Sequence, residues 1–511
     1  MTFSDNDEES HRRPGVCSFY TLCCASNHSK SKRYAVWCNC SFYQRPDLQL
    51  TGRTLIGKMP ARGQELCDHY MAALSSAHPA FECMKEIQAQ CLALGIPLKT
   101  RHREVAPNQY EMAPYFGTVV TQIDQNLIVM QIIEECAARF GLAALLQEKP
   151  FAGINGSGKH NNWSISTTEG VQLMKPQDLN KASGNPTCFP AVMAAVVRGV
   201  SMHGDLMRMA ISSPGNDFRL GAMEAPPAVI TTFLGDSMTE FLKGFMESGA
   251  AGEYTPAKAT VQTGVDALGS INIPAEDRNR TSPFPYGGYR FEFRAAGSTQ
   301  NTSMVNTVLC TMMADGFKAM ADEMEAGKSA EEVVQGVLKE NFKAVFNGNG
   351  YDPEWPDKAQ ALGVWRIDSG VDAINKLGEE KNLKLFGTHC VLTEAETIAR
   401  KDILLEQYLG VVDMEVHCMI NMIKTAVIPS CKAAGVDFAS ATAGVSTLEA
   451  AWAAIEHLDD LYAQAAAART LRLETMVAVR GDIDTLEGEV PESDWRLASY
   501  RDLLFLDTHR F

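Results

Sequence analysis

The sequence predicts an α+β fold followed by a largely helical region. Period-two alternation over residues 159–167 and 289–293 predicts strands, because successive side chains of a strand point to opposite faces. Helices are predicted where apolar residues recur at helical spacing, over residues 64–94, 125–146 and 191–211. Beyond about residue 393 the pattern is almost wholly helical, with Ala-rich windows over residues 450–468.

Composition narrows the class of protein. With 511 residues, 45% of them hydrophobic and 21% charged, the chain is typical of a globular protein with two or three structural units. No apolar run approaches the ~20 residues that span a bilayer, so we expect no membrane partner. A net charge of -16 works against nucleic-acid binding, which depends on Lys and Arg. The 14 cysteines lack zinc-ligand spacing and are typical of reduced thiols, so we expect a cytoplasmic protein, with an organelle as the alternative.

Three regions are predicted along the chain. Residues 1–44 form an atypical leader without Asp or Glu from position 10 onward, and we expect this leader to be poorly ordered. Residues 45–392 form the α+β domain, with a Gly-containing insertion over about residues 233–276. Residues 393–511 form the helical region.

Residues 153–160, GINGSGKH, nearly match a phosphate-binding P-loop. That motif needs Ser or Thr after the Lys and then a helix, whereas His160 and a strand pattern follow here. We therefore reject a P-loop and predict a glycine-rich turn whose amides approach an anion, followed by a strand. Alternation places His160, Asn162 and Ser164 on one polar face. The alternative is a hairpin that buries Trp163 and leaves this face in water.

A second polar face is predicted for the strand around residue 292. Alternation places Arg290, Glu292 and Arg294 together, while Phe291 and Phe293 point to the other side. A Glu between two Arg residues suits a metal carboxylate beside phosphate-binding guanidinium groups. The alternative is a solvated surface strand.

Two further carboxylates, Glu104 and Glu111, lie at the ends of a predicted strand–turn–strand over residues 100–111. Carboxylates so close repel each other unless a cation neutralises them. Together with His160 and Glu292 they make an oxygen-rich set with one imidazole, which favours Mg²⁺ or Mn²⁺ over zinc.

The remaining polar stretch spans residues 216–227 and contains Arg219 and Glu224. Its two prolines and small residues predict a loop. Such a loop either holds Arg219 and Glu224 over a site or is simply solvated.

Taken in order, these segments resemble the glutamine synthetase family, in particular its type III branch. The resemblance rests on RPDL at 45–48 with TGRT at 51–54, EVAP at 104–107, FAGINGSGKHNNWS at 151–164, NDFRLGAMEAPP at 216–227 and DRNRTSP at 277–283. It runs from about residue 45 to the end of the chain. It implies a catalytic domain of antiparallel strands that form a partial barrel flanked by helices.

The resemblance also implies residue roles. Glu104 and Glu111 would bind the metal beside glutamate and the transferred phosphoryl group, and His160 and Glu292 the metal on the ATP phosphates. For the ligands, it implies glutamate at Asn155, Gly156, Arg219 and Arg294, and the nucleotide at Asn162, Ser164 and Arg280. Arg280 would also stabilise the phosphoryl group in flight, and Glu224 would take a proton from ammonium.

The implied reaction joins ammonia to L-glutamate. The γ-carboxylate attacks ATP to give γ-glutamyl phosphate, and ammonia then displaces phosphate with Mg²⁺ or Mn²⁺ present. The implied assembly is a double-ring homo-oligomer with sites between subunits.

Two departures from the family pattern keep alternatives open. The family has a Glu-x-Glu strand shortly before RPDL, whereas residues 33–37 of this chain contain no acid. The family also has an N-terminal domain, for which this sequence has no room before residue 45. We therefore expect an N-terminally incomplete member. The alternatives are a catalytically silent homologue with a structural or regulatory role, and another γ-glutamyl ligase or a guanidino kinase on a related fold.

Overall fold

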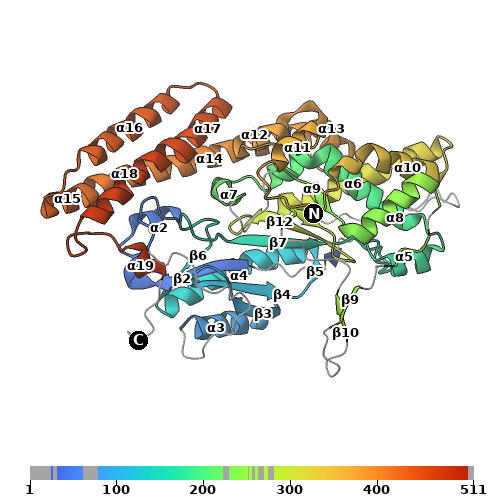
Figure 1. Cartoon of the computed structure of the whole chain (residues 1–511), viewed down its shortest axis with the longest axis horizontal. Coiled ribbons are helices and arrows are strands. Elements are labelled where there is room, and N and C mark those ends of the chain that lie inside the picture. Colours follow the sequence, from blue (N-terminus) through green and yellow to red (C-terminus); the bar gives the residue numbers. More distant parts are fainter. Residues whose placement is uncertain are drawn as a thin grey trace, which may run out of the picture.

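An antiparallel sheet lies at the centre of the computed structural model, which describes residues 25–26, 32–60, 79–221, 229–250, 252–255, 259–262, 270–273 and 281–504. Within these residues six strands form the sheet in the order β12-β7-β2-β4-β3, with β6 also paired to β2 (Figure 1). The strands are β2 (Lys32–Cys38), β3 (Leu98–Arg103), β4 (Gln109–Pro114), β6 (Leu142–Leu145), β7 (Gly158–Trp163) and β12 (Phe291–Gly297). The expected mixture of helices and strands is confirmed, and closure into a partial barrel stays a prediction.

Strand register places the expected polar positions on one face of the sheet. Lys32 of β2 is the Cα partner of both Met112 and Lys159, so these two lie on the same face. Their neighbours Glu111 and His160 therefore point to the opposite face.

Helices cover the face that carries Met112 and Lys159. The buried rings of Trp163, Phe291 and Phe293 belong to one core with helices α6 (Cys188–Ala210) and α9 (Ser303–Glu325). Met112 belongs to a second core with α3 (Pro79–Ala93) and α4 (Val119–Arg139). The face with Glu111 and His160 is thus the one available for a site.

Strand β2 lies within the predicted leader. Residues 32–38 pair with β4, β6 and β7 in the middle of the sheet. The run KRYAVWC is rich in aromatic and apolar residues that favour strands, and a lack of acids does not oppose pairing. Residues 1–24 and 27–31 of the predicted leader lie outside the described residues.

The predicted helices differ from the structure at their ends. The helix expected over residues 125–146 ends at Arg139, because Gly141 adopts a left-handed φ of 69° and β6 follows. The helix expected over residues 64–94 is described from Pro79 onward, and residues 61–78 lie outside the described part. The helix expected over residues 191–211 is confirmed as α6.

Short strands and further helices complete this part of the chain. The short strands are β1 (Ala25–Ser26), β5 (Gly117–Thr118), β8 (Thr232–Phe233), β9 (Ala259–Gln262), β10 (Ser270–Ile273) and β11 (Phe284–Pro285). The helices are α1 (Asn39–Phe42), α2 (Pro46–Thr51), α5 (Pro176–Ser183), α7 (Pro214–Arg219), α8 (Gly235–Ser248), α10 (Ala330–Asn341), α11 (Trp355–Ala361), α12 (Gly370–Asn375) and α13 (Glu380–Thr388). Within the predicted insertion, β9 and β10 pair as an antiparallel hairpin (Figure 1).

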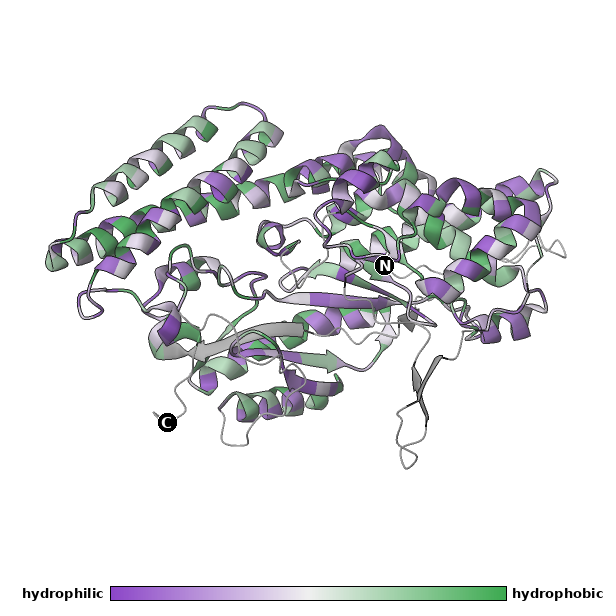
Figure 2. Cartoon of the chain, in the orientation of Figure 1, coloured by the Kyte–Doolittle hydropathy of each residue, from purple (hydrophilic) through white to green (hydrophobic). Residues whose placement is uncertain are grey.

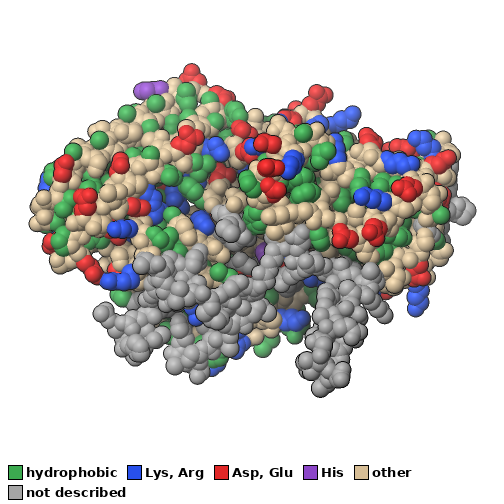
Figure 3. Space-filling model, viewed as in Figure 1, with side chains coloured by type: hydrophobic (Ala, Val, Ile, Leu, Met, Phe, Trp, Pro, Cys, Tyr) green, Lys and Arg blue, Asp and Glu red, His purple; other side chains and the backbone are tan. Residues whose placement is uncertain are grey.

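A helical module with its own core follows from Thr393, whose side chain and that of Glu396 form a capping box at the start of α14. Its helices are α14 (Glu394–Met422), α15 (Ile428–Ala434), α16 (Ala439–Glu456), α17 (Leu461–Thr470), α18 (Met476–Glu489) and α19 (Tyr500–Leu504), with π-helical segments at Ile423–Val427 and Leu471–Thr475. Hydrophobic and hydrophilic residues alternate along α14 and α18 (Figure 2). Acidic and basic side chains intersperse over the visible surface (Figure 3). Among the described helices, none is long and apolar enough to cross a membrane.

The last helix packs against a segment near the other end of the described chain. Tyr500 and Phe151 share a small core with Leu48, and their rings meet edge to face at 5.1 Å. The Tyr500 hydroxyl lies 2.6 Å from Thr54 Oγ1. Helix α19 therefore completes the packing of residues 45–57.

Candidate active site

A histidine and two glutamates form a tight cluster at the β3–β4 end of the open face. His102 Nε2 lies 3.2 Å from Glu104 Oε1 and 3.7 Å from Glu111 Oε2. One ligand atom from each residue lies within 4.8 Å of the others, and both carboxylates are buried. The structure thus brings together Glu104 and Glu111, as the predicted hairpin requires.

His102 was not among the residues predicted from the sequence. It is the Cα partner of Glu111 across β3 and β4, and it stands two residues before Glu104. The period of two alone could have placed it on the same face. Two buried carboxylates and an imidazole fit a divalent cation such as Mn²⁺ or Mg²⁺, since a cation relieves the repulsion between the carboxylates.

The second predicted ligand pair meets across β7 and β12. His160 Nδ1 lies 3.1 Å from Glu292 Oε1, and Arg294 Nη2 donates a hydrogen bond of 3.0 Å to Glu292 Oε2. Arg290 Nε donates to Asn162 Oδ1 at 2.7 Å. The two polar faces predicted separately thus form one continuous surface, because Glu292 and Asn162 are direct partners in the ladder.

The glycine-rich turn is anchored from β4. Gln109 Nε2 donates to the Gly156 carbonyl at 2.6 Å and to Ser157 Oγ at 3.0 Å. The turn leads into strand β7, as predicted when the P-loop was rejected. These contacts fix the segment that holds Asn155 and Gly156, and Ser164 is buried just beyond β7.

Arg219 ends α7 and lies buried against β12. Its Nη1 donates to Asn216 Oδ1 and to the Ala296 carbonyl, both at 3.2 Å, and its Nη2 donates to the Arg294 carbonyl at 3.3 Å. A side chain at Gly158 would overlap this guanidinium, so Arg219 also abuts the start of β7. The two remaining predicted residues, Glu224 and Arg280, lie outside the described residues.

An open pocket of about 630 Å³ adjoins Arg290. Its lining combines cations with aromatic rings: Lys99, Pro114, Tyr115, Phe116, Gln172, Lys175, Asp178, Tyr289 and Arg290. Arg290 Cζ lies 4.7 Å from the Tyr289 ring centre, and Lys99 Nζ lies 5.9 Å from that of Tyr115. Except for Arg290, sequence patterns did not single out these residues, because they come together only in the fold.

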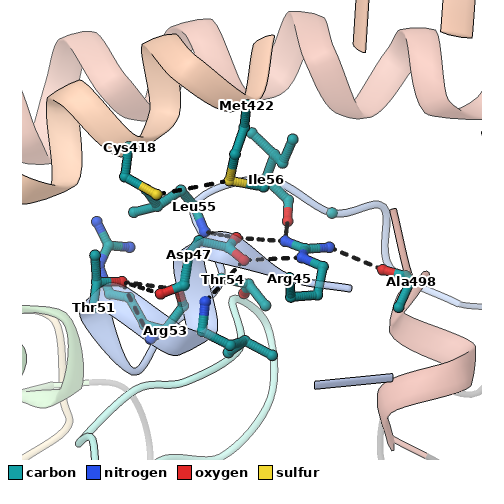
Figure 4. Close-up of polar contacts among 12 residues, drawn as sticks. Arg45, Asp47, Thr51, Arg53, Thr54, Leu55, Ile56, Cys418, Met422 and Ala498 are labelled. Atoms are coloured by element: carbon teal, nitrogen blue, oxygen red, sulfur yellow. Dashed lines mark hydrogen bonds and ion pairs between the residues drawn. The ribbon is translucent and has the colours of Figure 1, made fainter. Parts of the chain in front are cut away.

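The RPDL and TGRT segments form a network of polar contacts that reaches Ala498 (Figure 4). Arg45 donates to both carboxylate oxygens of Asp47, to the Ile56 carbonyl at 2.5 Å and to the Ala498 carbonyl at 3.0 Å. Asp47 in turn accepts from the Leu55 amide at 2.8 Å. Because these polar groups bind one another and backbone carbonyls, the segment has a structural role.

Carboxylates, imidazoles and guanidinium groups gathered on one face of an antiparallel sheet have the chemistry that suits metal ions and anionic ligands. Family comparison names the class more closely. Residues 51–203 match the model "Glutamine synthetase, catalytic domain", and residues 329–444 match "Glutamine synthetase C-terminal domain". The chain belongs to the glutamine synthetase family.

Individual relatives agree with this assignment. The chain is 37% identical over 397 residues to "Type-3 glutamine synthetase" of Dictyostelium discoideum, and the aligned residues cover 76% of this chain and 53% of the relative. It is 38% identical over 394 residues to "Glutamine synthetase" of Bacteroides fragilis (strain YCH46), covering 75% and 53%. The chain thus spans about half the length of these relatives. A solved structure, "Apo GmaS without ligand", is 14% identical with a TM-score of 0.45 and covers 75% of this chain and 69% of that one.

Proposed function

We propose that the chain catalyses the ATP-dependent ligation of ammonia to L-glutamate through γ-glutamyl phosphate. The observation that carries the proposal is the placement of two ligand groups on one sheet face: His102, Glu104 and Glu111, and His160 with Glu292. A ligase activity of the glutamine synthetase type also agrees with the family of the chain.

In this proposal the ligand groups hold two divalent cations. Glu104 and Glu111, joined by His102, would hold the first, and His160 with Glu292 would hold the second. Bound Mg²⁺ or Mn²⁺ would supply positive charge to the phosphoryl group that is transferred. Arg294 already neutralises part of Glu292, so this carboxylate would exchange one cation partner for another.

The remaining residues bind and orient the substrates. Arg219 and Arg294 would meet glutamate carboxylates, and Asn155 and Gly156 would orient the amino acid in the anchored turn. Asn162 and Ser164 would contact the nucleotide. Arg280 would stabilise the phosphoryl group, and Glu224 would accept a proton from ammonium.

We further propose that the nucleotide occupies the pocket beside Arg290. Its rings can stack on a base, while Lys99, Lys175 and Arg290 can pair with phosphates. The catalytic sheet would form the wall of a partial barrel in a homo-oligomer whose sites lie between subunits.

A silent homologue remains the second candidate, and strand β2 favours it. This strand stands between β4 and β7, and its sequence KRYAVWC offers two cations and no carboxylate. Arg33 is the Cα partner of Glu111. A chain of this kind would bind glutamate or ATP without turning them over.

The test measures glutamine and phosphate formed from ATP, L-glutamate and ammonium with Mg²⁺ or Mn²⁺. We expect turnover by the assembled wild type, its loss in Glu104→Gln, and no change in Glu82→Gln, whose exposed carboxylate pairs with Lys85 on the surface. Nucleotide binding without turnover would contradict the ligase and favour the silent homologue. Turnover with an amine or a guanidino compound in place of ammonium would point instead to another ligase or a kinase.

A further inference from the structure

The short helix α7 lies between the helical module and the sheet (Figure 1). On the module side, the Phe218 ring contacts two guanidinium groups, with Arg53 Cζ at 4.6 Å and Arg472 Cζ at 4.5 Å from its centre. Arg472 also donates from Nη1 to the Pro214 carbonyl at the start of α7. Pro214 and Phe218 of this helix are therefore held from the module side.

Both guanidinium groups are fixed by a single buried carboxylate. Glu415 of α14 accepts from Arg53 Nε and Nη2, both at 2.7 Å, and from Arg472 Nε at 2.6 Å and Nη2 at 2.8 Å. Glu415 and Arg472 are fully buried. This bidentate pairing of both arginines leaves the two cations that contact Phe218 little freedom to move.

A third contact reaches α7 from α14. Tyr408 donates its hydroxyl to Asp217 Oδ2 at 2.7 Å, and Arg208 Nη2 lies 3.8 Å from Asp217 Oδ1. On the opposite side, Asn216 donates to the Ala295 carbonyl at 2.8 Å and Arg219 lies on β12. Asp217 and Phe218 thus make contacts on the module side of the helix, and Asn216 and Arg219 make contacts with the sheet.

We propose that the helical module positions Arg219 through α7 and thereby sets the affinity of the site for glutamate. A helix of six residues is too short to be stable by itself, so its place depends on its contacts. Asp217 and Phe218 are positioning residues that touch no substrate, and they transmit the geometry of α14 to Arg219. This inference rests on the proposed role of Arg219 as a glutamate ligand.

The test compares two Tyr→Phe variants of the same module. Tyr408→Phe removes the hydrogen bond to α7. Tyr462→Phe is the matched control, because the Tyr462 hydroxyl donates at the same 2.7 Å to Asp372 of α12. We expect Tyr408→Phe to raise the KM for glutamate by about 10- to 100-fold, the value of one hydrogen bond to a charged group, and to leave the KM for ATP within about twofold. Tyr462→Phe should change neither constant.

A second measurement separates coupling from catalysis. Amide hydrogen exchange over residues 214–219 should be faster in Tyr408→Phe than in the wild type and unchanged in Tyr462→Phe. Equal exchange and equal KM values in both variants would overturn the proposal, and so would a parallel change in the KM for ATP. If the wild type forms no glutamine, the proposed function fails, and the exchange comparison alone then decides whether the module holds α7.

Discussion

Replacing Glu415 by Gln should destabilise the protein strongly although it alters no residue of the site. The substitution keeps the volume and removes the charge that Arg53 and Arg472 share. Both arginines are buried, and Arg472 has no exposed surface. Removing one partner from a buried ion pair costs roughly 3–5 kcal/mol, because the other charge stays buried and unpaired. Two cations lose their partner here, so we expect a loss of at least about 3 kcal/mol.

The assay is urea denaturation of the full chain, followed by circular dichroism, with Glu449→Gln as control. Glu449 lies in the same helical module and pairs with Lys424, but both side chains are 51% exposed. A surface pair of this kind contributes about 0–1 kcal/mol, so the control should unfold almost like the wild type. Equal urea midpoints for the two variants would refute the reasoning that the buried triad is held together by charge.

Three further outcomes are expected. Burial would raise the pKa of Glu415, but Arg472 and Arg53 outweigh it and hold the pKa at about 2, below its ordinary 4.5. The stability this provides is present above pH 4.5 and is lost as the pH falls toward 2, so unfolding free energies measured from pH 7 to 3 should decline more in the wild type than in Glu415→Gln. Gly158→Ala should displace Arg219 and lower kcat/KM for glutamate by about 100-fold. Gly481→Ala is the control, because Gly481 has open space around it, and it should leave kcat/KM unchanged. Equal kcat/KM values for the two variants would contradict the packing of Arg219 on β7. Glu111→Gln should weaken Mn²⁺ binding in calorimetry by at least about 10-fold; unchanged affinity would remove Glu111 from the ligands.

Sequence patterns predicted the strands of the site well because their alternation reflects real burial. Trp163, Phe291 and Phe293 face the helices, which left His160 and Glu292 to meet on the other side. The same patterns missed the end of α4, where a left-handed glycine decides between helix and strand. A continuous apolar run alone does not separate these two outcomes.

Residues that depend on distant partners were hidden from the sequence. His102 became a candidate only once Glu111 stood opposite it in the ladder. The RPDL segment carries part of the family resemblance, and in the fold Arg45 binds Asp47 and carbonyl groups as far away as Ala498. Sequence spacing carries no signal for contacts of this kind, because the fold brings the partners together.

The packing of Tyr500 against Thr54 and Phe151 has a consequence for synthesis on the ribosome. Residues 45–57 are translated before α19, and about 440 residues must be added before this helix can cover them. At ~5–20 residues per second this takes roughly 20–90 s, during which Leu48 and its apolar neighbours lack their final cover. A chaperone that shields this early segment would therefore raise the yield of folded chain. Loss of α19 would expose Leu48 and its apolar neighbours, which are translated long before that helix.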